Sequence, residues 1–114
     1  MKPSDVEKLF NSLIKEFDLD NLLIADAERR EVDFVFGEFL QREEIQKFVF
    51  EFSDDIAKSL KYKGDFTICI ETCDKKLCFV SRREVPGKIF VFSSIRQISI
   101  IGLVYNLIEI FRSF

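Results

Sequence analysis

The spacing of apolar residues changes along this chain in an order that restricts the folds it can adopt. Near both ends, and in one long run between them, apolar residues recur every three or four positions, which is the period of an amphipathic helix. The intervening segments are short and largely apolar, and one of them, Glu31–Phe36, has the two-residue alternation that is typical of strands. The order is helix, two strands, long helix, three strands, helix. Because 114 residues suit one hydrophobic core, we expect a single domain spanning residues 1–114.

The two outer helices have clear sequence signals. Ser4 followed by Glu7 has the form of a capping box, so the first helix begins there and continues to about residue 18. Its apolar stripe is Val6, Leu9, Phe10, Leu13, Ile14 and Phe17. The last helix is predicted from about Arg96 to Phe114, and apolar residues cover roughly half of its circumference. It is therefore expected to be deeply packed.

Five short segments are predicted to be strands, the first from its apolar run, the second from its alternation, and the last three because they are rich in Ile, Val, Phe or Thr. The first two form a hairpin around residues 27–30, which hold no Gly or Asn to supply the positive φ of the tightest turns, so the turn type stays open. The other three form a meander, because Asp, Pro and Gly lie between them. The five ranges are Asn21–Asp26, Glu31–Phe36, Phe66–Glu71, Leu77–Arg82 and Lys88–Ser93.

The middle helix is predicted from Glu38 to about Leu60, a run without Pro or Gly, and it has two candidate contact faces. We expect one face to cover the sheet: Ile45, Phe48, Val49, Phe52, Ile56 and Leu60. The second lies about 120° around the helix and has coiled-coil-like spacing: Phe39, Gln46, Phe50, Ser53 and Ala57. A single sheet covers only one face, so the second is predicted to bind a partner.

The strand Phe66–Glu71 is the second part of the expected interface. It contains no Pro or bulge signal that would protect it as a free edge. We therefore expect Phe66, Ile68 and Ile70 to join the second helix face in a homodimer contact.

The element order resembles the roadblock/dynein light chain family. The residues that carry this resemblance are Leu22 to Asp26 followed by Val32 to Phe36, similar to the family's opening hairpin, then the helix from Glu38, the meander and the closing helix. The resemblance covers residues 4–114 and departs from the family pattern at residues 27–30, where a Gly commonly helps to make the turn.

This resemblance implies an α+β fold of roadblock-like, or profilin-like, type. The five-stranded antiparallel sheet would carry the first and last helices on one face and the middle helix on the other. The resemblance also implies a homodimer or a pair with a related subunit, joined through the middle helices and the third strand. Such proteins bind small Ras-like GTPases and influence their nucleotide cycle or placement.

Composition argues against catalysis. The chain has 14 Phe and no His, so it lacks the side chain most often used as a general acid or base near neutral pH. Its Gly residues are too dispersed to cradle a phosphate. Three cysteines, Cys69, Cys73 and Cys78, do not have the spacing of a zinc site, so we assign them a structural role, with redox sensing or metal binding as alternatives. No enzyme activity, cofactor or resident metal is expected.

Charge is distributed unequally along the chain. Residues 1–60 hold 8 Lys/Arg against 15 Asp/Glu, and residues 61–114 hold 9 against 5. Such asymmetry can steer association with a charged partner or with a second copy of the chain, and the alternative is that both faces are simply solvated. A candidate basic docking rim lies in or beside two turns of the meander: Lys75, Lys76, Arg82, Arg83 and Lys88. The alternative is that these side chains are solvated strand ends.

The N-terminal residues lack the pattern of a secretory signal, and the longest apolar stretch is too short for a bilayer span, so a cytoplasmic location is expected. A pI near 5.1 argues against general nucleic-acid binding. The favoured hypothesis is a non-catalytic dimeric scaffold that binds a small Ras-like GTPase. The alternatives are a small-ligand sensor with an apolar pocket between sheet and helix, and a chaperone-like module that binds peptides at the Phe66 strand.

Overall fold

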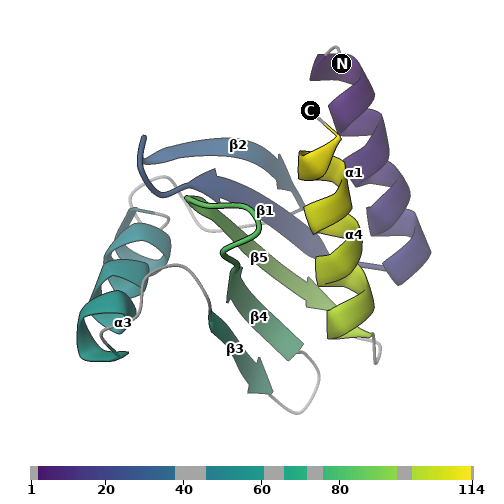
Figure 1. The fold of residues 1–114 in the computed structure, drawn as a ribbon. Coiled ribbons are helices and arrows are strands. Elements are labelled where there is room, and N and C mark those ends of the chain that lie inside the picture. The colour runs from purple at the N-terminus through teal and green to yellow at the C-terminus, as the bar shows by residue number, and fades with distance from the viewer. Residues whose placement is uncertain (1–2, 38–45, 61–65, 72–75, 95–98, 114) are drawn as a thin grey trace.

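The computed structural model describes residues 3–37, 46–60, 66–71, 76–94 and 99–113, and shows an α+β fold with the predicted order of elements. Figure 1 shows their arrangement. The helices and strands are α1 (Pro3–Phe17), β1 (Asn21–Asp26), β2 (Glu31–Phe36), η1 (Gln46–Glu51), α3 (Phe52–Leu60), β3 (Phe66–Glu71), β4 (Lys76–Ser81), β5 (Lys88–Ser94) and α4 (Ile100–Arg112).

The strands form one antiparallel sheet in the order β2-β1-β5-β4-β3. The N-terminal hairpin therefore lies on one side of β5 and the meander continues on the other. Three strands have the predicted bounds, while β4 begins and ends one residue earlier and β5 ends one residue later. Strands β2 and β3 are the two edges of this sheet.

The two faces of the sheet bury separate apolar clusters. Figure 1 shows α1 and α4 side by side at one side of the sheet and α3 at the other. Leu22 and Ile24 of β1 belong to the cluster beneath α1 and α4. The alternate residues, Leu23 and Ala25, belong to the cluster beneath η1 and α3. This alternation follows from the two-residue period of a strand. The predicted layers, with two helices on one face and the middle helix on the other, are confirmed.

The turn between β1 and β2 is held by Asp26. Its Oδ1 accepts hydrogen bonds of 3.0 Å from the backbone N–H groups of both Glu28 and Arg29. Arg30 then adopts a left-handed conformation with φ of 57°. An aspartate-stabilised turn thus replaces the Gly or Asn that the tightest hairpins use.

The last helix is shorter than predicted. Helix α4 spans Ile100–Arg112, and Ser99 caps it by accepting a hydrogen bond of 3.0 Å from the Gly102 N–H. Residues 95–98, where the sequence placed the start, lie outside the described residues. Among the helices that the structure describes, none has the length and apolar character needed to cross a membrane.

Candidate interaction surfaces

The middle helix, comprising η1 and α3, packs against the sheet through a face that the sequence assigned to a partner. Phe50 is only 2% exposed and packs in the same cluster as Val49, Leu23 and Ile89. Ser53 is also buried, and its hydroxyl donates to the Val49 carbonyl oxygen over 2.6 Å. The prediction that Phe50 and Ser53 face away from the sheet is therefore wrong.

The physical reason is that helical spacing alone does not decide which arc of a helix the sheet covers. The buried residues Val49, Phe50 and Ser53 fall within about 100° of an α-helical wheel. That arc combines one residue of the predicted sheet-facing stripe, Val49, with two of the predicted partner face. The segment Gln46–Glu51 is π-helical, and it contains no Pro or Gly that would signal this in the sequence.

An exposed aromatic face, formed by Phe48 and Phe52, takes the place of the predicted one. Phe48 is 49% exposed and Phe52 is 37% exposed, although the sequence placed both in the core. The Phe52 ring still touches the sheet, because its centroid lies 5.6 Å from that of Phe79 in an edge-to-face contact. The middle helix thus offers two partly open phenyl rings to solvent.

The remaining three residues of the predicted partner face are Phe39, Gln46 and Ala57. Ala57 is half-buried and lines the pocket described below. Phe39 lies outside the described residues, and so does the side chain of Gln46. The original five-residue face is therefore not available as one outward surface.

The edge strand β3 adjoins the aromatic face. Its described partner is β4, with which it pairs antiparallel from Phe66 opposite Ser81 to Glu71 opposite Lys76. Ile68 lies opposite Phe79, the residue that Phe52 contacts. Phe66 and Ile68 are half-buried, and the side chain of Ile70 lies outside the described residues. The outer edge of β3 and the aromatic face are therefore neighbours.

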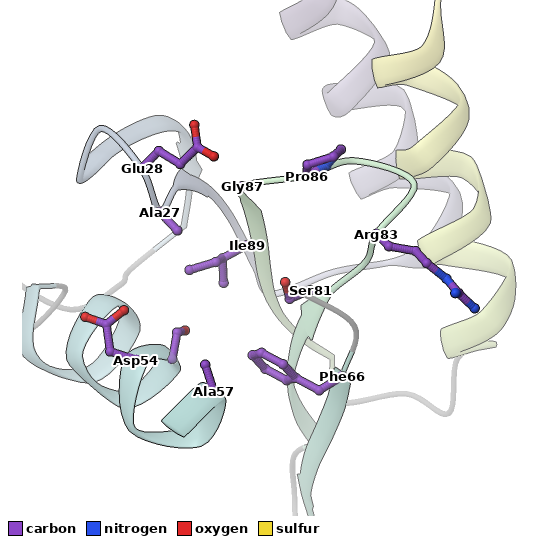
Figure 2. Close-up of a pocket in the computed structure, with 11 residues that line it drawn as sticks. Ala27, Glu28, Asp54, Ala57, Phe66, Ser81, Arg83, Pro86, Gly87 and Ile89 are labelled. Atoms are coloured by element: carbon purple, nitrogen blue, oxygen red, sulfur yellow. The ribbon is translucent and has the colours of Figure 1, made fainter. Parts of the chain in front are cut away.

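A pocket of about 440 Å³ opens between α3 and one end of the sheet. Figure 2 shows Ala57 and Phe66 on one side, with Ile89 between them and the turn that carries Pro86 and Gly87. The carboxylates of Glu28 and Asp54 lie on the side of the pocket nearer the helix and the first hairpin. The pocket therefore combines apolar walls with charged groups of both signs, because Arg83 also lines it.

Arg30 connects the first hairpin to the middle helix. Its guanidinium forms an ion pair with Asp54 of α3 and lies 5.4 Å from the centroid of the Phe50 ring. An arginine placed over an aromatic face is attracted by the ring's quadrupole. This contact was not predicted. The only sign of it in the sequence is a pair of arginines in a turn that lacks Gly.

The predicted basic docking rim is not a single surface. In an antiparallel meander, successive turns lie at opposite ends of the strands. Register pairs Lys76 with Ser94 at one end of β4 and β5 and Ser81 with Ile89 at the other. Arg82, Arg83 and Lys88 therefore lie at the opposite end from Lys76. Lys75 lies outside the described residues, and so does the Lys76 side chain.

Lys88 instead forms ion pairs with two carboxylates of the first hairpin. Its ammonium pairs with Asp33 and, over 3.4 Å, with Asp26, and it lies 5.6 Å from the centroid of the Phe111 ring. Partial burial acts to lower the pKa of Lys88, but the hydrogen bonds and charges of Asp33 and Asp26 outweigh it, so that pKa is raised. The pKa of Asp26 is lowered, first by the backbone N–H of Arg29 and also by Lys88.

The second edge strand, β2, exposes apolar side chains that the sequence analysis did not single out. Val32, Val35 and Phe36 are all exposed, with Val35 at 52%. A groove of about 380 Å³ runs between this strand and Glu7 and Asn11 of α1. The alternating pattern of β2 signalled a buried face, and only Phe34 is half-buried against α1.

Of the three cysteines, the structure describes two. Cys78 is buried in the cluster beneath α1 and α4, and Cys69 is exposed. Cys73 lies outside the described residues. Within the part of the chain that the structure describes, no cluster of three or more metal-binding side chains is found.

Solved structures of other proteins share this fold. Myxococcus xanthus MglB superimposes with a TM-score of 0.71 at 11% identity, over 98% of this chain and 91% of that chain. A structure of MglB with tetrameric arrangement gives 0.69 at 9% identity, over 99% and 88%. A Roadblock/LC7 domain from Streptomyces avermitilis gives 0.60 at 13% identity, over 90% and 88%. At the level of sequence, no family model and no curated protein matches this chain. The chain therefore has a roadblock-like fold, as the sequence resemblance predicted.

Proposed function

We propose that this chain is a non-catalytic regulatory scaffold that pairs with a second copy of itself and docks a small Ras-like GTPase. The observation that carries the proposal is the partly open aromatic face of Phe48 and Phe52 beside the edge strand β3. Roadblock proteins pair through their middle helices and third strands. The aromatic face and β3 belong to the same two elements.

The energetics of these surfaces favour self-association. Fully burying a phenylalanine side chain contributes about 1.5–3 kcal/mol, so covering the exposed halves of Phe48 and Phe52 contributes roughly 1 kcal/mol each. Pairing two β3 edges would satisfy backbone groups that an open edge leaves to water, and open edges attract other strands. Self-association of MglB in a tetrameric arrangement supports the same behaviour for a protein of this fold.

This proposal revises the predicted interface while keeping its two elements. Phe50 and Ser53 would support the interface indirectly, because they are buried on the side of the helix that faces the sheet. Phe48 and Phe52 would make the contact, together with β3. The GTPase would then dock on the composite surface, and any effect on its nucleotide cycle would come from positioning the GTPase's own groups.

The self-association step is tested by light scattering after size-exclusion chromatography and by sedimentation equilibrium. We expect the unmodified chain to be a dimer and a Phe48→Glu, Phe52→Glu variant to dissociate at least about tenfold more readily, since a factor of ten corresponds to about 1.4 kcal/mol. Ile101→Glu is the matched control, because Ile101 is 85% exposed on α4, across the sheet. Equal dissociation constants for the double variant and the unmodified chain would refute this interface.

The GTPase step is tested by pull-down with nucleotide-loaded Ras-like GTPases from the same genome. We expect one of them to bind in a nucleotide-dependent manner and the double variant to bind it more weakly. Single-turnover GTP hydrolysis then separates an activator from a passive scaffold. If no GTPase is retained in either nucleotide state, the GTPase part of the proposal fails while self-association remains to be judged on its own.

The pocket beside α3 favours a second candidate function, a small-ligand sensor. Its volume of about 440 Å³ lies within the range of small-molecule sites, about 300–1,000 Å³. Apolar walls and the carboxylate of Glu28 would suit an organic cation with an apolar body, which would compete with Arg30 for the Asp54 carboxylate. Thermal-shift screening with such amines tests this, and Ala57→Phe, which fills the pocket, should abolish any shift. A screen that leaves the melting temperature unchanged removes this candidate.

A further inference from the structure

Two cysteines lie directly opposite each other on the last two strands of the sheet. The register of β3 and β4 pairs Cys69 with Cys78, and their Sγ atoms are 2.8 Å apart. Side chains of directly opposed residues project from the same face of a sheet. The close approach of the two sulfur atoms therefore follows from the strand register.

The backbone geometry of such a pair suits a disulfide. Directly opposed residues in antiparallel strands have Cα atoms about 4.5–5.5 Å apart. Disulfides span Cα separations of about 4.4–6.8 Å. The two sulfur atoms can therefore bond while the strands keep their pairing.

The two thiols also differ in their access to solvent. Cys69 is on the edge strand and is exposed, whereas Cys78 is 1% exposed and belongs to the core cluster beneath α1 and α4. An oxidant dissolved in water therefore reaches Cys69 first. Cys78 is held beside it, where it can attack an oxidised Cys69.

We propose that Cys69 and Cys78 form a reversible oxidation site that closes an intrachain disulfide across β3 and β4. With a peroxide as the oxidant, the Cys69 thiol is oxidised to a sulfenic acid while the peroxide is reduced, releasing water from hydrogen peroxide. The Cys78 sulfur then attacks the Cys69 sulfur, an S–S bond forms, the S–O bond breaks, and a second water leaves. A dithiol such as dithiothreitol reverses the reaction by exchange.

The test uses the full chain with Cys73→Ser, so that Cys69 and Cys78 are the only thiols. The protein is treated with hydrogen peroxide, its remaining thiols are alkylated, and its intact mass is measured. We expect a monomeric product that has lost two hydrogen atoms and takes up no alkylating reagent. Reduction should restore two alkylatable thiols.

Peptide mapping locates the bond. Trypsin cleaves after Lys75 and Lys76, between the two cysteines, so a non-reducing digest should contain peptides 64–75 and 77–82 joined by the disulfide. Cys78→Ser in the same background should instead accumulate a Cys69 sulfenic acid that dimedone traps. Cys69→Ser should leave Cys78 reduced at the same peroxide dose.

Several results would overturn the proposal. These are retention of both thiols under conditions that oxidise a free thiol in solution, overoxidation of Cys69 with Cys78 still alkylatable, or a disulfide that joins two chains. Circular dichroism checks that Cys73→Ser folds, and Cys73→Ala replaces it if it does not. Each variant therefore gives a result on folded protein.

Discussion

Truncation of Phe50 is the most direct test of which helix face the sheet covers. Phe50 is 2% exposed and packs beside Leu23, Val49 and Ile89. Phe50→Ala should lower the free energy of unfolding by about 3–5 kcal/mol, since it removes a buried ring and leaves a cavity. The ring also lies beneath the Arg30 guanidinium, a contact that contributes about 0.5–1 kcal/mol at exposed sites. The total is a large part of the roughly 5–15 kcal/mol that stabilises a typical domain.

The matched variant is Phe48→Ala, two residues earlier in the same π-helical turn. Phe48 is 49% exposed, so its truncation should cost about 1 kcal/mol in the monomer. Urea unfolding followed by far-ultraviolet circular dichroism suits this chain, which has no Trp. Both variants should keep the slope of the unfolding free energy against urea concentration.

Protein concentration separates folding from self-association. The cost of Phe50→Ala should be nearly independent of concentration, because the ring packs within one chain. The cost of Phe48→Ala should increase with concentration if Phe48 lies in the dimer contact, because association stabilises the folded state by mass action. If Phe48→Ala costs several kcal/mol in dilute solution and Phe50→Ala less than about 1 kcal/mol, the assignment of the two faces is refuted.

Three further predictions concern the sheet and its caps. Asp26→Ala should cost about 1–2 kcal/mol and Asp26→Asn less, because an amide oxygen still accepts from the turn. The folded-state pKa of Asp26 is lowered, so its contribution is present above about pH 4 and is lost as pH falls through that lowered pKa; both variants should flatten the acid limb of a stability profile. Gly37→Ala should cost at least about 1–3 kcal/mol, because its φ is +85° and a Cβ would lie 2.4 Å from the Asp20 carbonyl oxygen. Ser99→Ala should cost about 1 kcal/mol and reduce the helicity measured by circular dichroism.

Local sequence patterns were sufficient to predict the strands. Each strand is a short run that contains apolar residues, and the structure places all five within one residue of the predicted bounds. The type of the hairpin turn could not be predicted from its residues, because its geometry depends on the Asp26 side chain and on a left-handed conformation at Arg30. Neither is a residue that a search for Gly or Asn would find.

The contacts between residues far apart in the chain could not be predicted from the sequence. Lys88 is far along the chain from Asp26 and Asp33, and the pairing of β1 with both β5 and β2 brings their charges together. The same pairing removes Lys88 from the predicted basic rim. The Cys69 and Cys78 pair likewise depends on the register of β3 and β4, because the spacing of three cysteines does not decide which two of them meet.

The sequence by itself determined the order of elements, because apolar period and turn chemistry are local properties of the chain, and the roadblock-like topology followed from the resemblance which that order carries. Only the tertiary structure decided which face of the middle helix meets the sheet. It buries Phe50 and leaves Phe48 about half exposed. A helical wheel shows which residues share a face, but two apolar faces can compete for one sheet, and only the packing of the whole chain decides which of them is covered.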